Sequence, residues 1–257
     1  MLILSAHQPA FLPWLGLIEK VILSDIFIVM DIAKFRKRAF MHRNKIEING
    51  KPHILGIHTN NDSDFKSCDE IEISKKFKDD LFLISEKIKH TYKKSKYWID
   101  VSEFCEETLL KDASITNLVE LSLIQLKYLC QKLKINSKIV KESSITNKVD
   151  VSKLNASQRL FFHANYFKAN IYITGINSLN YLDKTSFAEA KIYNYIQNFN
   201  YNFFNSHQKC KEPLSIVHQI ANLGFKNISE WLFTESNFKK EEMINTFNSS
   251  LKKGFNQ

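Results

Sequence analysis

The first thirty residues contain two apolar stretches that flank a loop and a short helical pattern. This order restricts the fold more than any other feature of the chain. Residues 2–6 form a short apolar run, residues 17–23 have helical spacing, and residues 26–30 (IFIVM) are continuously apolar. An uninterrupted apolar run is typical of a strand that is covered on both faces. The order therefore predicts a βαβ unit with a parallel pair of strands and a right-handed crossover, and with it an α/β fold.

A hairpin is predicted next, because Asn49-Gly50 supplies the positive φ that both central positions of such a turn need. The flanking strands are expected at residues 40–48 and 52–58. Regular alternation would place Arg43 and Asn44 on opposite faces of the first strand. Periodicity further predicts a helix within residues 115–133, a helix at 154–167, a strand at 171–174 and two or three helices at the end of the chain.

The length of 257 residues fits either one large domain or two smaller lobes. We expect an N-terminal α/β lobe at residues 1–140, with a mixed sheet and the hairpin, and a largely helical C-terminal α/β lobe at residues 156–257. The polar stretch at residues 141–155 would join them. One continuous domain is the alternative.

Composition excludes several classes of protein. A hydrophobic fraction of 44% supports a sizeable core, and the four cysteines have no paired spacing, so we expect buried free thiols and neither a zinc site nor a disulfide framework. We expect no cofactor. No apolar run approaches the roughly 20 residues of a membrane helix, and the first residues do not resemble a signal peptide. These features predict a cytoplasmic protein without membrane insertion.

The net charge of +9 permits an anionic partner such as a nucleotide-sugar, a phosphate or RNA. A lysine-rich surface with no particular partner is the alternative. The distribution of arginine favours a specific role, because only four of the 36 basic residues are Arg and three of them lie at positions 36–43. Guanidinium groups bind phosphate or carboxylate bidentately, which lysine cannot do.

His7-Gln8 follows the first predicted strand and Asp31 follows the second, where ligands of parallel sheets gather. Pro9 and Pro13 stiffen the intervening loop. A neutral imidazole can act as a general base near pH 7, and a glutamine amide both donates and accepts hydrogen bonds. The alternatives are that His7 and Gln8 only satisfy loop backbone and that Asp31 only pairs with a nearby arginine.

Two later segments are further candidates. Tyr172 and Gly175 mark the end of a predicted strand, with Tyr181 shortly after, and glycine is scarce in this chain. Gly175 would allow either a close ligand approach or a simple turn. His207-Gln208 and Ser215 lie in a polar region before a predicted helix, where Ser215 could also serve as an N-cap. The chain lacks a nucleophile elbow, a Walker loop, a dinucleotide-binding fingerprint and an HExxH motif.

Several of these segments resemble the WbqC-like family. The stretch HQPAFLPWLG at residues 7–16 and RNKI at residues 43–46 carry the resemblance, and YITG at 172–175 and PLS at 213–215 extend it in the same order. The family motif corresponds here to His7, Gln8, Pro9, Trp14, Gly16, Asp31, Lys37, Arg43 and Asn44.

The resemblance implies a role in bacterial O-antigen or related surface-polysaccharide biosynthesis, as an aminoacyl (glycyl) transferase that acylates a nucleotide-linked amino sugar. In this hypothesis His7 accepts the proton of the attacking amine and Asp31 orients His7 or the amine. Arg38 and Arg43 hold the diphosphate, and Gln8 or Asn44 donates to the oxyanion. The activated amino-acid donor is left open, with aminoacyl-tRNA as one candidate. A nucleotidyltransferase-like enzyme and a non-catalytic binding or scaffold protein are the alternatives.

The predicted catalytic residues are thus His7 and Asp31. The predicted substrate-binding residues are Gln8, Trp14, Lys37, Arg38, Arg43, Asn44, Tyr172, Gly175, Tyr181, His207, Gln208 and Ser215.

Overall fold

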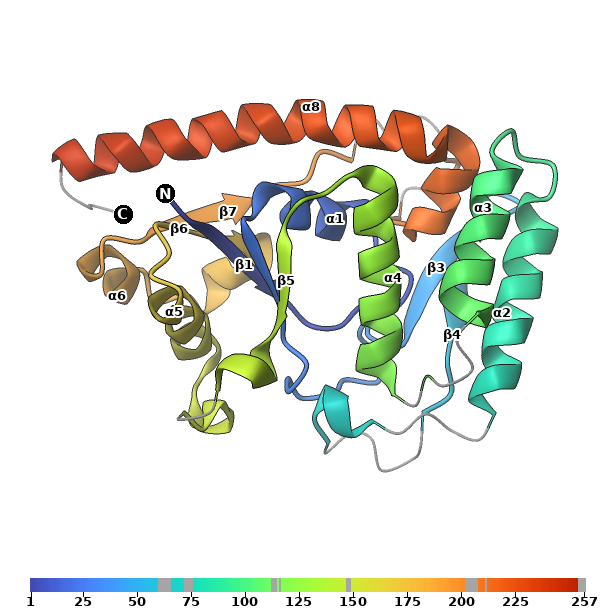
Figure 1. Ribbon diagram of the computed structural model, residues 1–257, viewed down its shortest axis with the longest axis horizontal. Helices are drawn as coiled ribbons and strands as arrows, with labels where there is room; N and C mark the ends of the chain where they lie inside the picture. Colours follow the sequence, from blue (N-terminus) through green and yellow to red (C-terminus); the bar gives the residue numbers. More distant parts are fainter. Residues whose placement is uncertain are drawn as a thin grey trace.

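A computed structural model describes residues 1–59, 66–71, 76–111, 115, 117–146, 149–201, 208–210 and 212–253. Its centre is a five-stranded sheet in which the strands follow the order β5-β2-β1-β6-β7 (Figure 1). The strands are β1 (Ile3–His7), β2 (Ile26–Val29), β5 (Lys138–Lys141), β6 (Ile171–Gly175) and β7 (Tyr193–Gln197). Each neighbouring pair is parallel. The predicted α/β class is therefore confirmed.

The predicted βαβ unit at the N-terminus is also confirmed. Helix α1 (Leu15–Leu23) connects β1 to β2, and these strands pair in parallel with His7 opposite Val29. All nine residues of α1 are buried, which explains why its sequence is almost wholly apolar. The first strand therefore lies in the interior of the sheet, and its last residue faces the start of α1.

The hairpin forms a separate antiparallel sheet of β3 (Arg43–Ile48) and β4 (Lys51–Gly56). Its turn has a φ of 52° at Asn49 and 76° at Gly50, as the predicted turn requires. Asn44 and Ile46 face the core, and Arg43 faces outward, so the predicted alternation holds. Antiparallel pairing between named strands is thus confined to the hairpin within the described residues.

Helices surround the two sheets. They are α2 (Phe77–Tyr92), α3 (Trp98–Cys105), α4 (Leu118–Leu133), α5 (Ala156–Tyr166), α6 (Lys184–Glu189) and α8 (Ile216–Lys253). Helix α8 runs along the molecule and packs against α1, α3 and α4 (Figure 1). Its backbone is not helical at Gly224, where φ is 72°, so two helical segments meet there at a kink.

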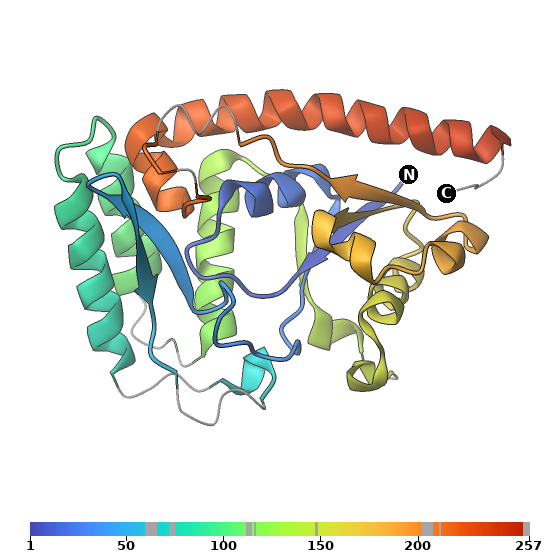
Figure 2. The same ribbon diagram turned by 180° about the vertical axis from the view of Figure 1, so that it is seen from behind.

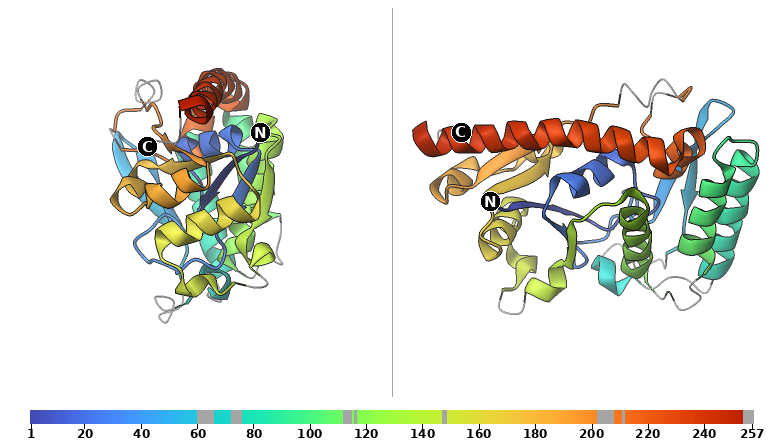
Figure 3. Two further views of the ribbon diagram at one scale, coloured as in Figure 1. Left: turned by 90° about the vertical axis from the view of Figure 1, so that its left-hand side faces the viewer. Right: turned by 45° about the horizontal axis from the view of Figure 1, so that its top comes forward.

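The central sheet is covered on both faces, as the end-on view of Figure 3 shows. On one face Ile3, Ile171 and Ile173 pack against Met243 and Phe247 of α8. On the other, a cluster joins the sheet to α5 and α6 and includes Leu4, Ala6, Tyr172, Leu160, Ala164 and Phe187. Successive residues of β1 therefore alternate between the α8 side and the α5 side.

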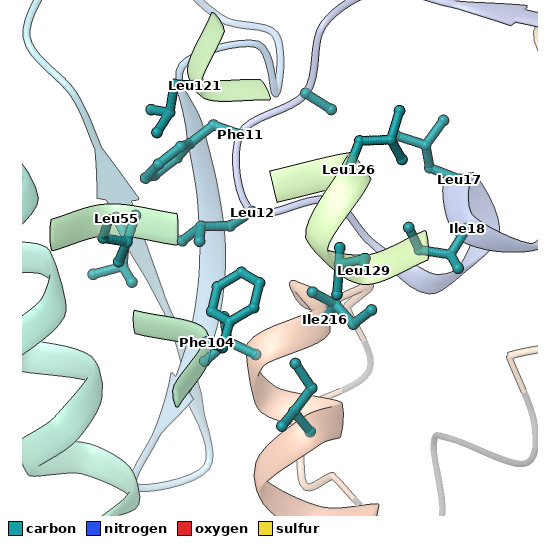
Figure 4. Packing of buried hydrophobic residues seen from close by; sticks show 14 of the residues in the cluster. Phe11, Leu12, Leu17, Ile18, Leu55, Phe104, Leu121, Leu126, Leu129 and Ile216 are labelled. Carbon is teal, nitrogen blue, oxygen red and sulfur yellow. The ribbon is translucent and has the colours of Figure 1, made fainter. Parts of the chain in front are cut away.

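The largest hydrophobic cluster lies between the central sheet and the hairpin. Phe11 and Leu12 of the loop after β1 pack there with Leu121 and Leu129 of α4 and with Leu55 of β4 (Figure 4). Figure 2 shows the hairpin beside α2, at the end of the molecule away from α5 and α6. This cluster fixes the path of the loop that follows His7.

Residues of both predicted lobes form one sheet, because β1 pairs with β6 and β2 pairs with β5. The stretch predicted as a linker begins with the end of β5 and a 3-10 turn at Glu142–Ile145. All four cysteines are buried free thiols, as predicted. Among the described helices, none combines the length and apolar character needed to span a membrane.

Candidate functional site

A cavity of about 700 Å³ opens at the carboxyl ends of β1 and β6. From β1 the chain proceeds through α1 to β2 on one side, and from β6 it proceeds through α6 to β7 on the other. Such a point, where neighbouring connections run in opposite directions, is the usual ligand site of an open parallel sheet. The cavity is lined by His7, Gln8, Trp14, Gly16, Leu17, Lys20, Arg36, Tyr172, Thr174, Gly175, Ser178, Tyr181, Gln197 and Phe199, among others.

His7 ends β1 and lies between the sheet and α1. Its Nδ1 is 2.7 Å from the carbonyl oxygen of Gln8. Because that oxygen can only accept, the proton of the neutral imidazole is assigned to Nδ1 and Nε2 keeps its lone pair. The Trp14 indole packs edge-on against the imidazole, with ring centroids 5.2 Å apart. Burial, together with the nearby Lys20 ammonium, lowers the pKa of His7 to about 4.

Lys20 is a buried cationic side chain in the cavity wall. Its side chain is only 7% exposed and its Nζ donates to the carbonyl oxygen of Ala6, at 3.3 Å. No carboxylate in the described ranges forms an ion pair with it. Burial lowers the pKa of Lys20 to about 8, because desolvation disfavours the ammonium.

The loop between His7 and α1 is held from several sides. Ser122 Oγ accepts from Ala10 N at 2.9 Å, and Gln125 Oε1 accepts from Leu12 N at 2.8 Å. Asn44 Nδ2 donates to the carbonyl of Leu12 at 2.6 Å. Leu12 has a φ of 46° and is fully buried. The predicted rigidity of this loop therefore comes from tertiary hydrogen bonds as well as from its prolines.

The opposite wall follows β6. Ser178 Oγ donates to Thr174 Oγ1 at 2.8 Å, and Thr174 in turn donates to Asn194 Oδ1 at 3.1 Å. Gly175 has a φ of −87°, so its turn does not require glycine. A Cβ added there would meet no protein atom within 4 Å. The space in front of Gly175 is thus open to a ligand.

A buried ionic network supports Tyr172. Its hydroxyl is 3.2 Å from His163 Nδ1, and His163 Nε2 is 2.8 Å from Glu142 Oε1. Arg159 forms a bidentate pair with the same carboxylate. Burial alone would raise the pKa of Glu142, but the hydrogen bonds from His163 and Arg159 outweigh it and the net pKa is lowered. The network joins α5 to the floor of the cavity.

Asp31 does not orient His7, contrary to the sequence-based hypothesis. Its carboxylate accepts from the backbone N of Ser143 at 2.9 Å and from the Ser143 hydroxyl at 2.5 Å. The Nδ1 of His7 is instead bonded to Gln8. Asp31 lies at the end of β2, and its side chain is directed to the chain that follows β5. It therefore joins these two strand ends and does not line the cavity.

Of the three arginines at positions 36–43, Arg36 lines the cavity. Arg38 and Arg43, which were predicted to hold a diphosphate, do not. Arg43 donates to the backbone oxygen of Arg38 at 2.7 Å, outside the cavity. Lys37 and Arg38 are exposed and are not among the lining residues. Asn44 is buried, and its amide is engaged by the loop carbonyls, so it does not face the cavity as an oxyanion donor.

The remaining candidates lie beside the hairpin. Gln208 donates to the carbonyls of Cys210 and Glu212, and Ser215 N donates to the carbonyl of Lys45 at 2.8 Å. Ser215 is buried directly before α8. Neither side chain lines the cavity. His207 lies outside the described residues.

The structure adds residues that sequence reasoning did not select, chiefly Lys20, Arg36 and Gln197. Gln197 donates to the carbonyl of Gly16 at 2.8 Å and so ties β7 to the start of α1. A signal for Lys20 was present, since Glu19 and Lys20 are the two charged residues in a helix that is apolar elsewhere. Within the part of the chain that the structure describes, no group of three or more His, Cys, Asp or Glu side chains could hold a metal ion.

Comparison with known proteins agrees with the resemblance found in the sequence. The chain matches the model of the WbqC-like protein family over residues 8–230, which is most of its length. The matched region contains the hairpin and the lining residues of the cavity other than Ala6 and His7, which directly precede it. No curated protein matches the chain. No solved structure matches it either.

Proposed function

We infer the function from the premise that this chain belongs to the WbqC-like protein family. We propose that it is an aminoacyl transferase that acylates the amino group of a nucleotide-linked amino sugar, with glycine as the first acyl group to test. The pathway we propose is the biosynthesis of a bacterial surface polysaccharide such as O-antigen.

One observation carries the proposal, namely the position of His7. The His7 imidazole, in which Nε2 carries the lone pair, lies at the end of a central parallel strand and lines a cavity of about 700 Å³. Its lowered pKa, about 4, keeps it unprotonated at neutral pH. A neutral imidazole with a free lone pair can accept a proton from a bound amine, and it becomes a stronger base as its pKa rises toward the working pH.

The reaction would form one amide bond and break one ester bond. The sugar nitrogen attacks the carbonyl carbon of the aminoacyl donor, and His7 Nε2 accepts the proton that the nitrogen loses. When the tetrahedral intermediate collapses, the carbon–oxygen bond of the ester breaks and the proton passes to the departing hydroxyl oxygen. The Gln8 side chain lines the same cavity and can donate to the oxyanion, because N–H donors stabilise the negative charge that develops in the transition state.

The cavity has the composition expected for a sugar or a nucleoside. Rings from Trp14, Tyr181, Phe199 and Tyr201 line it, together with amide side chains from Gln8, Asn177, Gln197 and Asn198. Aromatic faces pack against sugars and bases, and amides bond their hydroxyl and carbonyl groups in either direction. A volume of this size falls within the usual range for small-molecule sites, roughly 300–1,000 Å³.

The test is product formation. Purified protein is incubated with a panel of nucleotide-linked amino sugars and with glycyl-tRNA, and the products are analysed by mass spectrometry. The expected product is an amino sugar whose mass has increased by one glycyl residue, with deacylated tRNA as the second product.

Two controls define the result. The N-acetylated form of the same sugar has no free amine and should give no product. Free glycine in place of glycyl-tRNA should also give none, because its carboxylate is not activated. Absence of an adduct with every amino sugar and aminoacyl donor in the panel would contradict the proposed function.

A further inference from the structure

The charge of the cavity is unbalanced. Lys20 and Arg36 line it, and no Asp or Glu is present among its described lining residues. The nearest acidic neighbour in sequence, Glu19, is bonded by Gln197 and Lys239 instead. A cavity with two cations and no carboxylate is complementary to an anionic ligand.

Lys20 itself is costly to bury. It is 7% exposed, and among the described residues its hydrogen-bond partner is the carbonyl of Ala6, at a long 3.3 Å. An ammonium that leaves water without a counter-charge destabilises the folded state, and methionine would fill the same volume without that penalty. The position of Lys20 on the cavity wall indicates that a ligand supplies the missing negative charge.

The first turn of α1 lies at the same place. Gly16, Leu17 and Lys20 all line the cavity, and the four-residue step from Gly16 to Lys20 places both on one face of the helix. The turn carries no acidic residue, and Trp14 at the N-cap makes no side-chain capping bond. The amino end of a helix has a partial positive charge, and its first N–H groups can bind phosphate. In α1 the N–H groups of Leu17 and Ile18 donate to the carbonyl of Trp14, so Leu15 and Gly16 are the residues that would offer theirs to a ligand. Lysine side chains point back toward that end.

We propose that Lys20 and the first turn of α1, with Arg36 at the edge, form the subsite that binds the diphosphate of the substrate. This inference rests on the proposed function, because it assigns the diphosphate of the nucleotide-linked sugar to a particular wall of the same cavity. It also replaces the assignment of that group to Arg38 and Arg43, which lie outside the cavity.

The subsite would couple substrate binding to His7. The Lys20 ammonium is one of the groups that depress the pKa of this imidazole, after burial. A bound diphosphate neutralises that ammonium and adds negative charge near the ring, and both effects favour protonation of His7. His7 would thus be a stronger base when the acceptor is bound than when the cavity is empty.

Calorimetry with simple probes tests the subsite independently of any transfer reaction. The probes are inorganic pyrophosphate, UDP and uridine, and the proteins are the wild type, Lys20→Met, and the matched controls Arg38→Met and Arg43→Met. Pyrophosphate and UDP should bind the wild type. Lys20→Met should weaken the affinity for each of these two probes by roughly 10- to 100-fold, as expected for loss of a charge-assisted hydrogen bond. The two control variants should bind pyrophosphate within about twofold of the wild type.

A second measurement does not depend on substitution. The imidazole of His7 is titrated by NMR in the wild type with and without pyrophosphate, and its pKa should rise when the probe is present. Pyrophosphate binding by Lys20→Met at wild-type affinity, loss of binding in Arg38→Met or Arg43→Met alone, or an unchanged His7 pKa would overturn the inference. So would failure of the wild type to bind either pyrophosphate or UDP.

The two proposals fail in different ways. If an adduct forms but pyrophosphate affinity does not depend on Lys20, the transferase function stands and the subsite is wrong. If pyrophosphate binds through Lys20 but no sugar is acylated, the subsite stands and the function is wrong.

Discussion

Asn44 of the hairpin donates its side-chain amide to the carbonyl oxygen of Leu12, at 2.6 Å, and a second N–H of the same amide group reaches the carbonyl of Phe11 at 3.2 Å. These two carbonyls belong to the buried loop that follows His7. Asn44 therefore positions this loop and joins it to the hairpin.

Substitution of Asn44 by alanine should destabilise the protein and loosen the loop. The buried carbonyls of Phe11 and Leu12 would lose these donors, which costs about 1–3 kcal/mol of unfolding free energy. Urea unfolding measures this quantity. Arg43→Ala is the matched control on the outward face of the same strand, and its effect should be below about 1 kcal/mol. Equal effects of the two substitutions would contradict the positioning role.

Binding of a diphosphate diester should weaken as the pH rises above about 8. Lys20 has a pKa of about 8 and is charged below that pH. The attraction between its ammonium and the diphosphate is therefore present at neutral pH and is lost as Lys20 deprotonates. The bound anion stabilises the charged form of Lys20, so the pKa of Lys20 is higher in the complex than in the free protein. Calorimetry from pH 6.5 to 10 measures the trend, with a diester because its phosphates do not titrate in this range. A Lys20→Arg variant that still binds the diester should keep its affinity to higher pH than the wild type does. If the affinity of the wild type does not change with pH, the assignment of Lys20 is refuted.

Gly175→Ala should leave stability almost unchanged and reduce ligand affinity. The added methyl group would meet no protein atom within 4 Å and the φ of −87° suits alanine, so no strain is expected. The methyl group would instead occupy space at the cavity wall. Thermal unfolding and UDP calorimetry on the same sample separate the two effects. If the same calorimetry finds an unchanged affinity for UDP and for the glycylated nucleotide-sugar product, no ligand approaches Gly175.

Glu142→Gln should destabilise the fold by roughly 3–5 kcal/mol, because Arg159 and His163 would lose their buried partner. The pH dependence follows from the lowered pKa of Glu142. Its stabilisation is complete above the unfolded pKa, ordinarily 4.5, and is lost as the pH falls through the lower folded value. Urea unfolding between pH 6 and pH 3 should therefore show a steeper loss for the wild type than for the variant. Parallel curves would contradict this account.

The interior of the sheet could be predicted from sequence, whereas its edges could not. Strands β1, β2 and β6 are buried on both faces, and their sequences ILSAH, IFIV and IYITG are accordingly mostly apolar. Strands β5 and β7 are the edges of the sheet. They are half-exposed, and their sequences KIVK and YNYIQ have too few apolar residues to stand out from a loop.

The site was predicted in part for a similar reason. A strand end can be located from sequence, so the ends of β1 at His7 and of β6 at Gly175 were each predicted. The parallel pairing of these two strands, which was not predicted, places both residues at one edge of the sheet. The direction of a polar side chain depends on tertiary partners, and for this reason Asp31 and Asn44 were assigned to a cavity that neither lines. Lys20 was missed because its burial at the cavity, without an ion pair among the described residues, depends on tertiary structure that periodicity does not reveal.

The most direct test compares the wild type with His7→Gln in the transfer of glycine to a nucleotide-linked amino sugar, followed as product mass over time at saturating substrate. Glutamine retains a polar side chain but cannot accept a proton as a base, so circular dichroism and UDP affinity should stay close to those of the wild type. We predict that the rate of adduct formation falls by about 100-fold or more. A His7→Gln protein that forms the adduct within about twofold of the wild-type rate would contradict the central claim.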